Sequence, residues 1–253
     1  MLQRRFLFFA PMLSDMNVIS LFKNKCRSIH RIWGRDDGQM NAPMIYELQR
    51  PKTIDPNKKY PALFMMHGIG SNEQNMLSLV RGMEEQFFIF SIRGHLPQPP
   101  GYAFFTIQGY GKPHREVFDQ AIGKLTSFIE YATEQYPVEQ SQLYLLGFSQ
   151  GAILSLTLGL TLGDRIKGIV ALSGYIPGFV KEEYGKKSVD HMSLFISHGE
   201  MDQVLPYEWG VANHEYYQGL GASVTFKSYQ DGHAISIQNL HDFQQWLLAS
   251  LTK

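Results

Sequence analysis

The 253-residue sequence contains a single cysteine and no excess of charge of either sign. Cys26 cannot form an internal disulfide, so nothing in the sequence points to an oxidising compartment. Lys plus Arg and Asp plus Glu both number 23, which leaves no general attraction for a nucleic acid or an anionic membrane surface. We therefore expect no nucleic-acid partner and no disulfide framework.

Long apolar runs are also missing. Residues 6–13 follow Gln3-Arg4-Arg5 and resemble the start of a secretory signal, but the run ends at Ser14 and no A-x-A-like cleavage site follows. We expect no stable membrane insertion and a cytoplasmic location, with a cleaved signal as the alternative. Residues 1–30 are interpreted as an N-terminal extension, and Met16 is an alternative start.

Metal-binding and repeat patterns are missing as well. The sequence has no HExxH motif, no clustered Cys/His spacing and no internal repeat or low-complexity tract. We expect no metal and no other cofactor.

The sequence does contain alternating strand-like and helix-like segments, with an apolar content of 44% that suits a buried core. Buried strands that alternate with amphipathic helices indicate a parallel sheet covered on both faces. We predict one α/β domain over residues 31–253. The expected strands are residues 43–50, 60–66, 87–92, 143–148, 166–172, 194–197 and 224–229, and the expected helices are residues 74–85, 117–136, 150–162, 207–219 and 235–250.

A glycine-flanked serine lies between one of these strands and the next helix. Gly147-Phe148-Ser149-Gln150-Gly151 matches G-x-S-x-G in the strand–turn–helix context that this nucleophile motif requires. The two glycines leave room for a turn so sharp that the serine side chain is exposed. We predict that Ser149 is a catalytic nucleophile.

A serine nucleophile needs a histidine to take its proton and an acid to orient that histidine. Asp202 follows the strand at 194–197, and His233 follows the strand at 224–229. Carboxyl ends of parallel strands meet at one edge of a sheet, which is where ligands and chemistry gather. The sequence therefore predicts Ser149, Asp202 and His233 as a triad.

Other acids fit less well than Asp202. Asp231 is only two residues from the predicted catalytic histidine, and Asp164 and Asp190 precede strands instead of following them. His198 neighbours the acid loop, and we interpret it as a structural residue beneath that loop.

An acyl-transfer site also needs two N–H donors for the oxyanion. The backbone amide of Gln150, directly after the serine, supplies one. The glycine-rich stretch His67-Gly68-Ile69-Gly70 follows another buried strand, and the Ile69 amide is predicted to be the second donor.

Taken together, these motifs resemble the α/β-hydrolase superfamily, within its small carboxylesterase, lysophospholipase and acyl-protein thioesterase group. The HGIGSNEQN loop is similar to that of a bacterial esterase-like branch, although Asn75 stands where that family often has Asp. Residues 1–30 have no clear family counterpart. The likeness extends over residues 43–250 through HGIG at 67–70, GFSQG at 147–151, LSGYIP at 172–177, HGEMDQVLP at 198–206 and GH at 232–233.

The resemblance implies a domain without a separate cap, so that loops form the acyl pocket. The aromatic-rich loop at 95–114 and two turns at strand ends supply candidates for substrate binding: Tyr102, Phe104, Phe105, Tyr175, Ile176 and Leu205.

We therefore predict a cofactor-free serine hydrolase, monomeric or homodimeric, that cleaves small esters or thioesters of short to medium acyl chains through an acyl-enzyme. One alternative is a peptidase or amidase on the same fold. The other is a non-catalytic binding protein that retains the fold.

Overall fold

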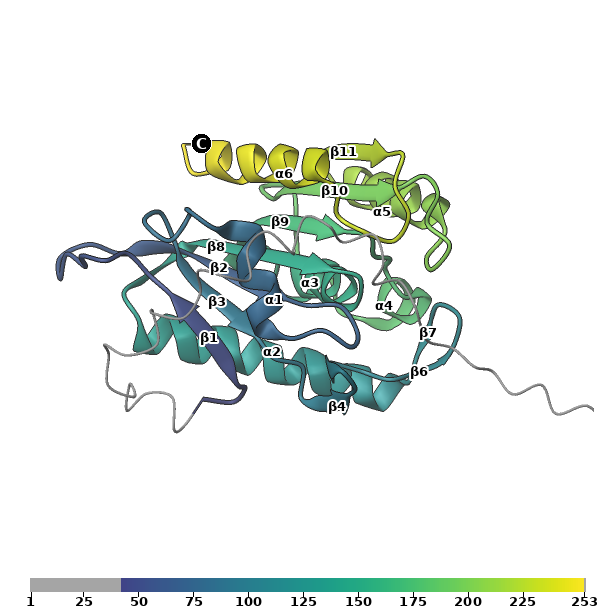
Figure 1. The fold of residues 1–253 in the computed structure, drawn as a ribbon, viewed down its shortest axis with the longest axis horizontal. Coiled ribbons are helices and arrows are strands. Elements are labelled where there is room, and N and C mark those ends of the chain that lie inside the picture. Colours follow the sequence, from purple (N-terminus) through teal and green to yellow (C-terminus); the bar gives the residue numbers. More distant parts are fainter. Residues whose placement is uncertain (1–41, 253) are drawn as a thin grey trace, which may run out of the picture. The chain divides into compact units, whose positions relative to one another are not determined.

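The apolar runs of the sequence become neighbouring strands of one seven-stranded sheet in the computed structural model, which describes residues 42–252. The strand order is β1-β3-β2-β8-β9-β10-β11 (Figure 1). All neighbouring strands are parallel except β1 and β3, which are antiparallel. The strands are β1 (Tyr46–Gln49), β2 (Tyr60–Met66), β3 (Phe88–Ile92), β8 (Val138–Phe148), β9 (Ile166–Leu172), β10 (Ser193–Gly199) and β11 (Ser223–Tyr229).

Helices cover both faces of this sheet, because alternate strand side chains point to opposite sides. On β2, Phe64 packs in a core cluster with residues of α2, α3 and α5, whereas Leu63 and Met65 pack in a second cluster with residues of α1 and α6. This arrangement confirms the predicted α/β sheet with helices on both faces. The helices are α1 (Glu73–Leu77), α2 (Arg115–Gln135), α3 (Gln150–Leu162), α4 (Gly178–Glu183), α5 (Tyr207–Gly219) and α6 (Ile237–Ser250).

Several boundaries differ from the sequence prediction. The helix expected at 74–85 ends at Leu77 and continues only as a 3₁₀ turn over Ser78–Val80, before Gly82 adopts φ +88° and turns the chain away. Strand β8 begins at Val138, earlier than expected, because Tyr60 of β2 pairs with that residue. The short helix α4 was not predicted.

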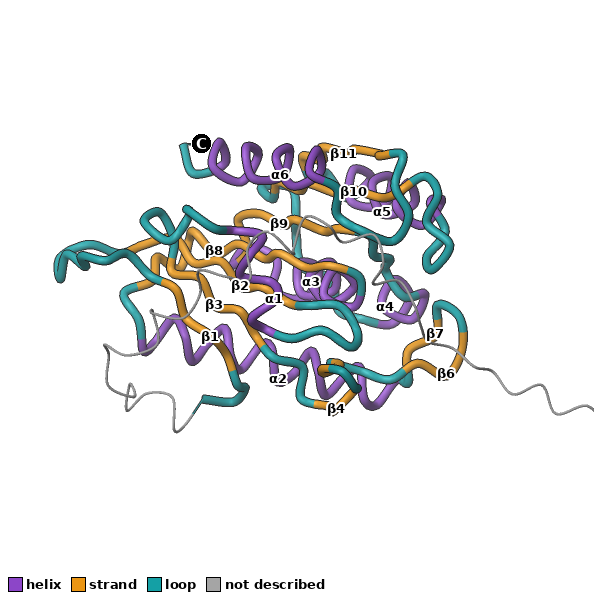
Figure 2. The backbone as a smooth tube through the Cα atoms, viewed as in Figure 1, coloured by secondary structure: helices purple, strands orange, loops and turns teal. Residues whose placement is uncertain are grey.

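The segment between β3 and α2 is more ordered than the long loop that the sequence predicted. It contains two small antiparallel hairpins, which Figure 2 shows as short strands within a loop-rich path: β4 (Leu96–Gln98) with β5 (Gly101–Ala103), and β6 (Ile107–Gly109) with β7 (Lys112–Pro113). Within residues 42–252, these hairpins form two small two-stranded sheets beside the main sheet.

The loops that follow the parallel strands share one edge of the sheet, where α4 and the β6–β7 hairpin also lie (Figure 1). Within the described range, every helix is too short or too polar to span a bilayer. The predicted extension at 1–30, the alternative start at Met16 and Cys26 lie outside the described residues.

Candidate active site

Ser149 occupies a strained turn between β8 and α3. Its φ of 54° and ψ of −115° lie in a region that L-residues rarely adopt. The two motif glycines make this turn possible: a Cβ on Gly147 would lie 2.1 Å from the Gly151 backbone, and a Cβ on Gly151 would lie 1.8 Å from the Met66 carbonyl oxygen. The Ser149 amide donates to the Leu172 carbonyl (2.9 Å), which fixes the turn against β9.

His233 connects this serine to Asp202. Its Nε2 lies 2.9 Å from Ser149 Oγ, and its Nδ1 lies 2.7 Å from Asp202 Oδ2. An ionised carboxylate only accepts hydrogen bonds, so Nδ1–H donates to Asp202 and Nε2 accepts from the serine hydroxyl. The structure thus brings together all three residues of the predicted triad, from three separate loops.

Asp202 is held as a carboxylate by its surroundings. Its side chain has no exposed surface, and its Oδ1 accepts from the amides of Val204 (2.8 Å) and Leu205 (2.9 Å). Burial by itself would raise the pKa of Asp202, but hydrogen bonds from His198, His233 and the Leu205 amide outweigh burial and hold that pKa well below its ordinary value.

His198 lies beneath the acid loop, as expected. Its Nε2 is 3.0 Å from the Leu205 carbonyl oxygen and 3.4 Å from Asp202 Oδ2, and the side chain is buried. The ring packs closely against Gly210 of α5, where an added Cβ would lie 2.7 Å from it. The histidine therefore ties the acid loop to α5.

The two predicted oxyanion donors flank the serine. A Cβ on Gly68 would lie 3.2 Å from the Ser149 Cβ, so the loop that carries Ile69 passes directly beside the nucleophile. Gln150 is the first residue of α3, where helical N–H groups lack intrahelical acceptors. Among the turn and loop hydrogen bonds of residues 42–252, neither amide donates to a backbone acceptor.

The Gln150 side chain also forms two hydrogen bonds that were not predicted from the sequence. Its Oε1 accepts from the Phe104 amide (3.0 Å), and its Nε2 donates to the Phe105 carbonyl (2.7 Å). It therefore anchors the segment between β5 and β6 to the start of α3.

A further set of residues fixes the loop after β2. The ring of His67 is fully buried; its Nδ1 bonds to the Gly68 carbonyl (2.7 Å), and its Nε2 accepts from the Gly94 amide (2.9 Å). Burial lowers the pKa of His67, which favours the neutral ring that these two bonds require. The nearby Glu73 is buried against Arg93, an ion pair that the sequence did not reveal because its members lie on different elements.

The predicted substrate-binding residues fall into two groups: some pack against other side chains, and others line a pocket. Phe104 is buried against the His67 ring, and Phe105 is 1% exposed and packs on Phe118 with ring centroids 5.0 Å apart. Tyr102 lies under the Arg93 guanidinium, and the Leu205 side chain is nearly buried beside the acid loop. In this arrangement these four contribute packing.

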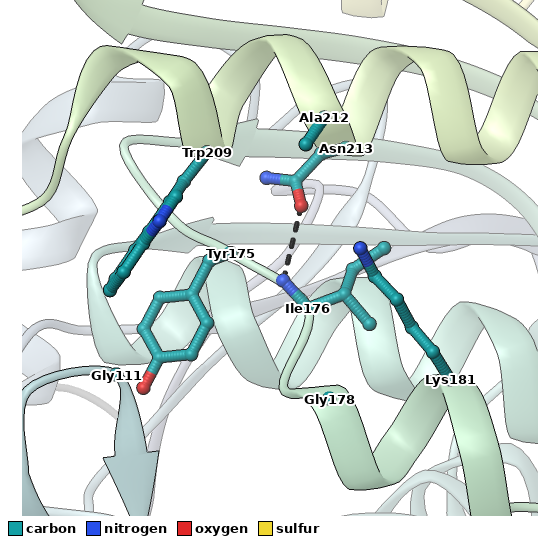
Figure 3. Close-up of a pocket in the computed structure, with 8 residues that line it drawn as sticks. All are labelled: Gly111, Tyr175, Ile176, Gly178, Lys181, Trp209, Ala212 and Asn213. Carbon is teal, nitrogen blue, oxygen red and sulfur yellow. Dashed lines mark hydrogen bonds between the residues drawn. The ribbon is translucent and has the colours of Figure 1, made fainter.

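Tyr175, in contrast, lines a pocket of about 230 Å³ between α4, α5 and the β6–β7 hairpin (Figure 3). Ile176 lines it too. The sequence analysis missed Trp209 and Lys181, because both lie within helical segments whose position relative to the strand ends is set only by packing. The pocket is lined by Gly111, Tyr175, Ile176, Gly178, Lys181, Trp209, Ala212 and Asn213.

A serine at a strand–helix turn, a histidine and an acid on later strand loops, and a mostly parallel sheet together define the α/β-hydrolase class of enzymes. Residues 49–251 match the family model described as phospholipase/carboxylesterase. The chain belongs to this family, and it is a hydrolase.

Individual relatives agree with this assignment. Acyl-protein thioesterase 1 of Emericella nidulans is 30% identical over 227 residues, which covers 78% of this chain and 93% of that protein. Acyl-protein thioesterase 1 of Debaryomyces hansenii is 29% identical over 229 residues, covering 81% and 97% of the two chains. The solved carboxylesterase of Bacillus cereus has a TM-score of 0.75 at 22% identity and covers 85% of this chain and 100% of its own, which shows the shared fold.

Proposed function

We propose that this protein is a serine hydrolase of carboxylic esters or thioesters, with short to medium acyl chains, in which Ser149, His233 and Asp202 form the catalytic triad. One observation carries the proposal: His233 lies within hydrogen-bond distance of both Ser149 Oγ (2.9 Å) and Asp202 Oδ2 (2.7 Å). The relatives named carboxylesterase and acyl-protein thioesterase support ester or thioester substrates.

The reaction proceeds in two acyl transfers. Ser149 Oγ attacks the substrate carbonyl carbon while His233 Nε2 takes the hydroxyl proton, and the Ile69 and Gln150 amides hold the oxyanion. Collapse breaks the bond to the alcohol or thiol, which leaves with the proton from His233. Water then attacks the acyl-enzyme, gives its proton to His233, and releases the carboxylic acid with regeneration of Ser149.

The size of the pocket supports short to medium acyl chains. Its volume of about 230 Å³ is below the roughly 300–1,000 Å³ typical of sites for drug-sized ligands. Each buried methylene adds about 0.8 kcal/mol to binding until the pocket is full, and further methylenes remain in water. A series of p-nitrophenyl esters should therefore show kcat/KM rising over the first few carbons and then levelling or falling.

Labelling with a fluorophosphonate probe tests the nucleophile. The wild-type protein should carry the label on the peptide that contains Ser149, and Ser149→Ala should abolish labelling and lower kcat by about 10⁴-fold or more. Ser155→Ala is the matched control. This substitution removes a buried hydroxyl of α3 that donates to the Gly151 carbonyl (2.9 Å) and has no proposed catalytic role. Labelling that persists in Ser149→Ala would reject the proposal.

A comparison of p-nitrophenyl acetate with p-nitroacetanilide separates the esterase from a peptidase or amidase. The proposed enzyme cleaves the ester far faster, because an amine leaving group must be protonated before it departs. Comparable turnover of the two substrates would favour the amidase alternative.

A further inference from the structure

One side of this pocket is aromatic, and the other side carries a positive charge. Tyr175 and Trp209 form an aromatic wall on one side, with ring centroids 4.7 Å apart and ring planes tilted by 59°, and Lys181 extends from α4 along the other side (Figure 3). Ile176 and Ala212 add further apolar surface. An ammonium group is the only charged group that lines this pocket among the described residues.

Lys181 is partly buried, yet it has no carboxylate partner among the described residues. Its Nζ lies 4.9 Å from the centroid of the Tyr216 ring, but within the described part of the chain it forms no ion pair. Glu183, which follows it on α4, is exposed and pairs with Arg115 (2.5 Å). Burial lowers the pKa of Lys181, and no carboxylate compensates for the loss of water around its ammonium group.

The wall of this pocket is rigidly connected to the nucleophile turn. The Ser149 amide bonds to Leu172, the last residue of β9, and the chain leaves that strand through Gly174, whose added Cβ would lie 2.5 Å from Ala152 in the first turn of α3. The Asn213 side chain then fixes the same loop, accepting from the Ile176 amide (3.1 Å) and donating to the Gly174 carbonyl (2.9 Å). The loop that carries Tyr175 and Ile176 is therefore held against α5 and against the first turn of α3, the helix that follows Ser149.

We propose that this pocket binds a carboxylate-terminated arm of the ester substrate, with its methylenes against Tyr175 and Trp209 and its carboxylate on the Lys181 ammonium. This inference rests on the proposed function and names its substrate class. The carboxylate arm belongs either to the acyl part, as in a half-ester of a short dicarboxylic acid, or to the alcohol part, as in the ester of a short hydroxy acid.

The chemistry at Ser149 is unchanged by this specificity. Water cleaves the ester bond, giving a dicarboxylate and an alcohol in the first case, and a monocarboxylate and a hydroxy acid in the second. The carboxylate supplies Lys181 with a charge partner that compensates for the water lost on burial, which makes the contact stronger than one to an exposed lysine.

Matched substrate pairs test the proposal on the wild-type enzyme. The acyl arm compares monoethyl glutarate and monoethyl adipate with ethyl esters of unbranched acids of the same chain length, and the alcohol arm compares the acetate ester of 4-hydroxybutyrate with butyl acetate. We expect kcat/KM for the carboxylate-bearing member to exceed that of its neutral partner by about tenfold in one arm, which corresponds to one charge-assisted contact. Equal or lower values in both arms would overturn the inference, while Ser149-dependent turnover of the neutral esters would leave the proposed function standing.

Variants then assign the preference to Lys181. Lys181→Met should lower the ratio of carboxylate-bearing to neutral kcat/KM by about tenfold, and Lys181→Arg should retain most of it. Lys112→Met is the control, because it removes an exposed positive charge next to Gly111 at the pocket edge and should keep the ratio. An equal loss in Lys112→Met would overturn the assignment in favour of general electrostatic attraction.

Binding without turnover gives an independent measurement. In the Ser149→Ala background, the Kd of the preferred carboxylate-bearing ester, measured by calorimetry, should rise about tenfold on adding Lys181→Met. An unchanged Kd would overturn the inference. Failure of every ester to show Ser149-dependent turnover would instead reject the proposed function itself.

Discussion

His233 is the residue on which the geometry of the site depends, because it contacts both of its partners from a loop of its own. Its ring lies 5.0 Å from that of Phe148, which supports one side of the imidazole. Asp202 fixes the other end, and His198 and two loop amides hold that carboxylate in turn. The orientation of the His233 ring is therefore set by Asp202 and by the groups that hold Asp202 in place.

Asp202→Asn should lower kcat by about 10²–10⁴-fold with little change in the fold, because the amide cannot both accept from His233 Nδ1 and present a negative charge to it. The asparagine Oδ1 can still accept from Val204 and Leu205, so the acid loop should keep its shape. Steady-state kinetics with circular dichroism measure both effects. Asp231→Asn is the control, and full activity in Asp202→Asn would direct attention to another carboxylate.

Phe105→Ala should act mainly on stability. The ring is 1% exposed and packs on Phe118, so its removal leaves a cavity that costs about 3–5 kcal/mol in free energy of unfolding. Denaturant unfolding measures this cost, and Ile107→Ala, at an exposed position two residues away, should stay within about 0.5 kcal/mol of wild type. An unchanged stability together with a shift to longer acyl chains would place Phe105 in the substrate pocket instead.

At the scale of elements, the crossing of α3 over β2 decides where the serine lies. The first turn of α3 passes so close to the end of β2 that Gly151 has no room for a side chain beside the Met66 carbonyl. Gly123 of α2 is a contrasting helical glycine, because nothing lies within 4 Å of a Cβ added there.

Alanine substitutions at Gly151 and Gly123 should change the stability of the protein in opposite directions. Gly151→Ala should lower stability by more than about 2 kcal/mol or shift α3 and reduce activity, because a Cβ at 1.8 Å from a backbone oxygen forces the backbones apart. Gly123→Ala should instead stabilise the protein by about 0.5–1 kcal/mol through its higher helix propensity. Thermal unfolding and ester turnover measure the pair, and a neutral Gly151→Ala would contradict the tight crossing.

At the scale of the whole molecule, the dependence of stability on pH reflects the buried histidines. Burial lowers the pKa of both His67 and His95 in the folded protein. Below about pH 6.5 the unfolded chain takes up these protons before the folded protein does, so the free energy of unfolding falls as the pH drops from there towards the folded pKa values. The pKa of Asp202 is also lowered in the folded protein, but from a lower ordinary value, so the stability that Asp202 contributes persists until the pH falls below about 3.9.

Urea unfolding between about pH 7.5 and 5 should therefore show a loss of stability that becomes smaller in His67→Asn, which removes one of the groups that must stay neutral. The comparison is between slopes with pH, so a lower stability of the variant at neutral pH does not affect it. Identical slopes for the two proteins would show that protonation of His67 is not linked to unfolding.

Features of this protein that depend on local pattern could be predicted from the amino-acid sequence. Apolar runs marked the strands of the sheet, and the glycines of the G-x-S-x-G motif marked the turn that only small residues permit. The positions of Asp202 and His233 also followed from the sequence, because loops after parallel strands share one edge, and the structure places both within hydrogen-bond distance of their partners there.

The side chains that line the pocket could not be predicted from the sequence, because their directions depend on how distant elements pack. Phe105 is aromatic and lies in the expected segment, yet it packs inward on α2, whereas Lys181 and Trp209 come from helices and meet across a pocket that no spacing along the chain reveals. The Glu73–Arg93 ion pair and the contact of Gln150 with the β5–β6 segment also join residues that are far apart in the sequence, so they could not be predicted from it. Strand and turn preferences act over a few neighbouring residues, but the direction of a side chain on a loop or helix depends on the element packed against it, which lies far away in the sequence.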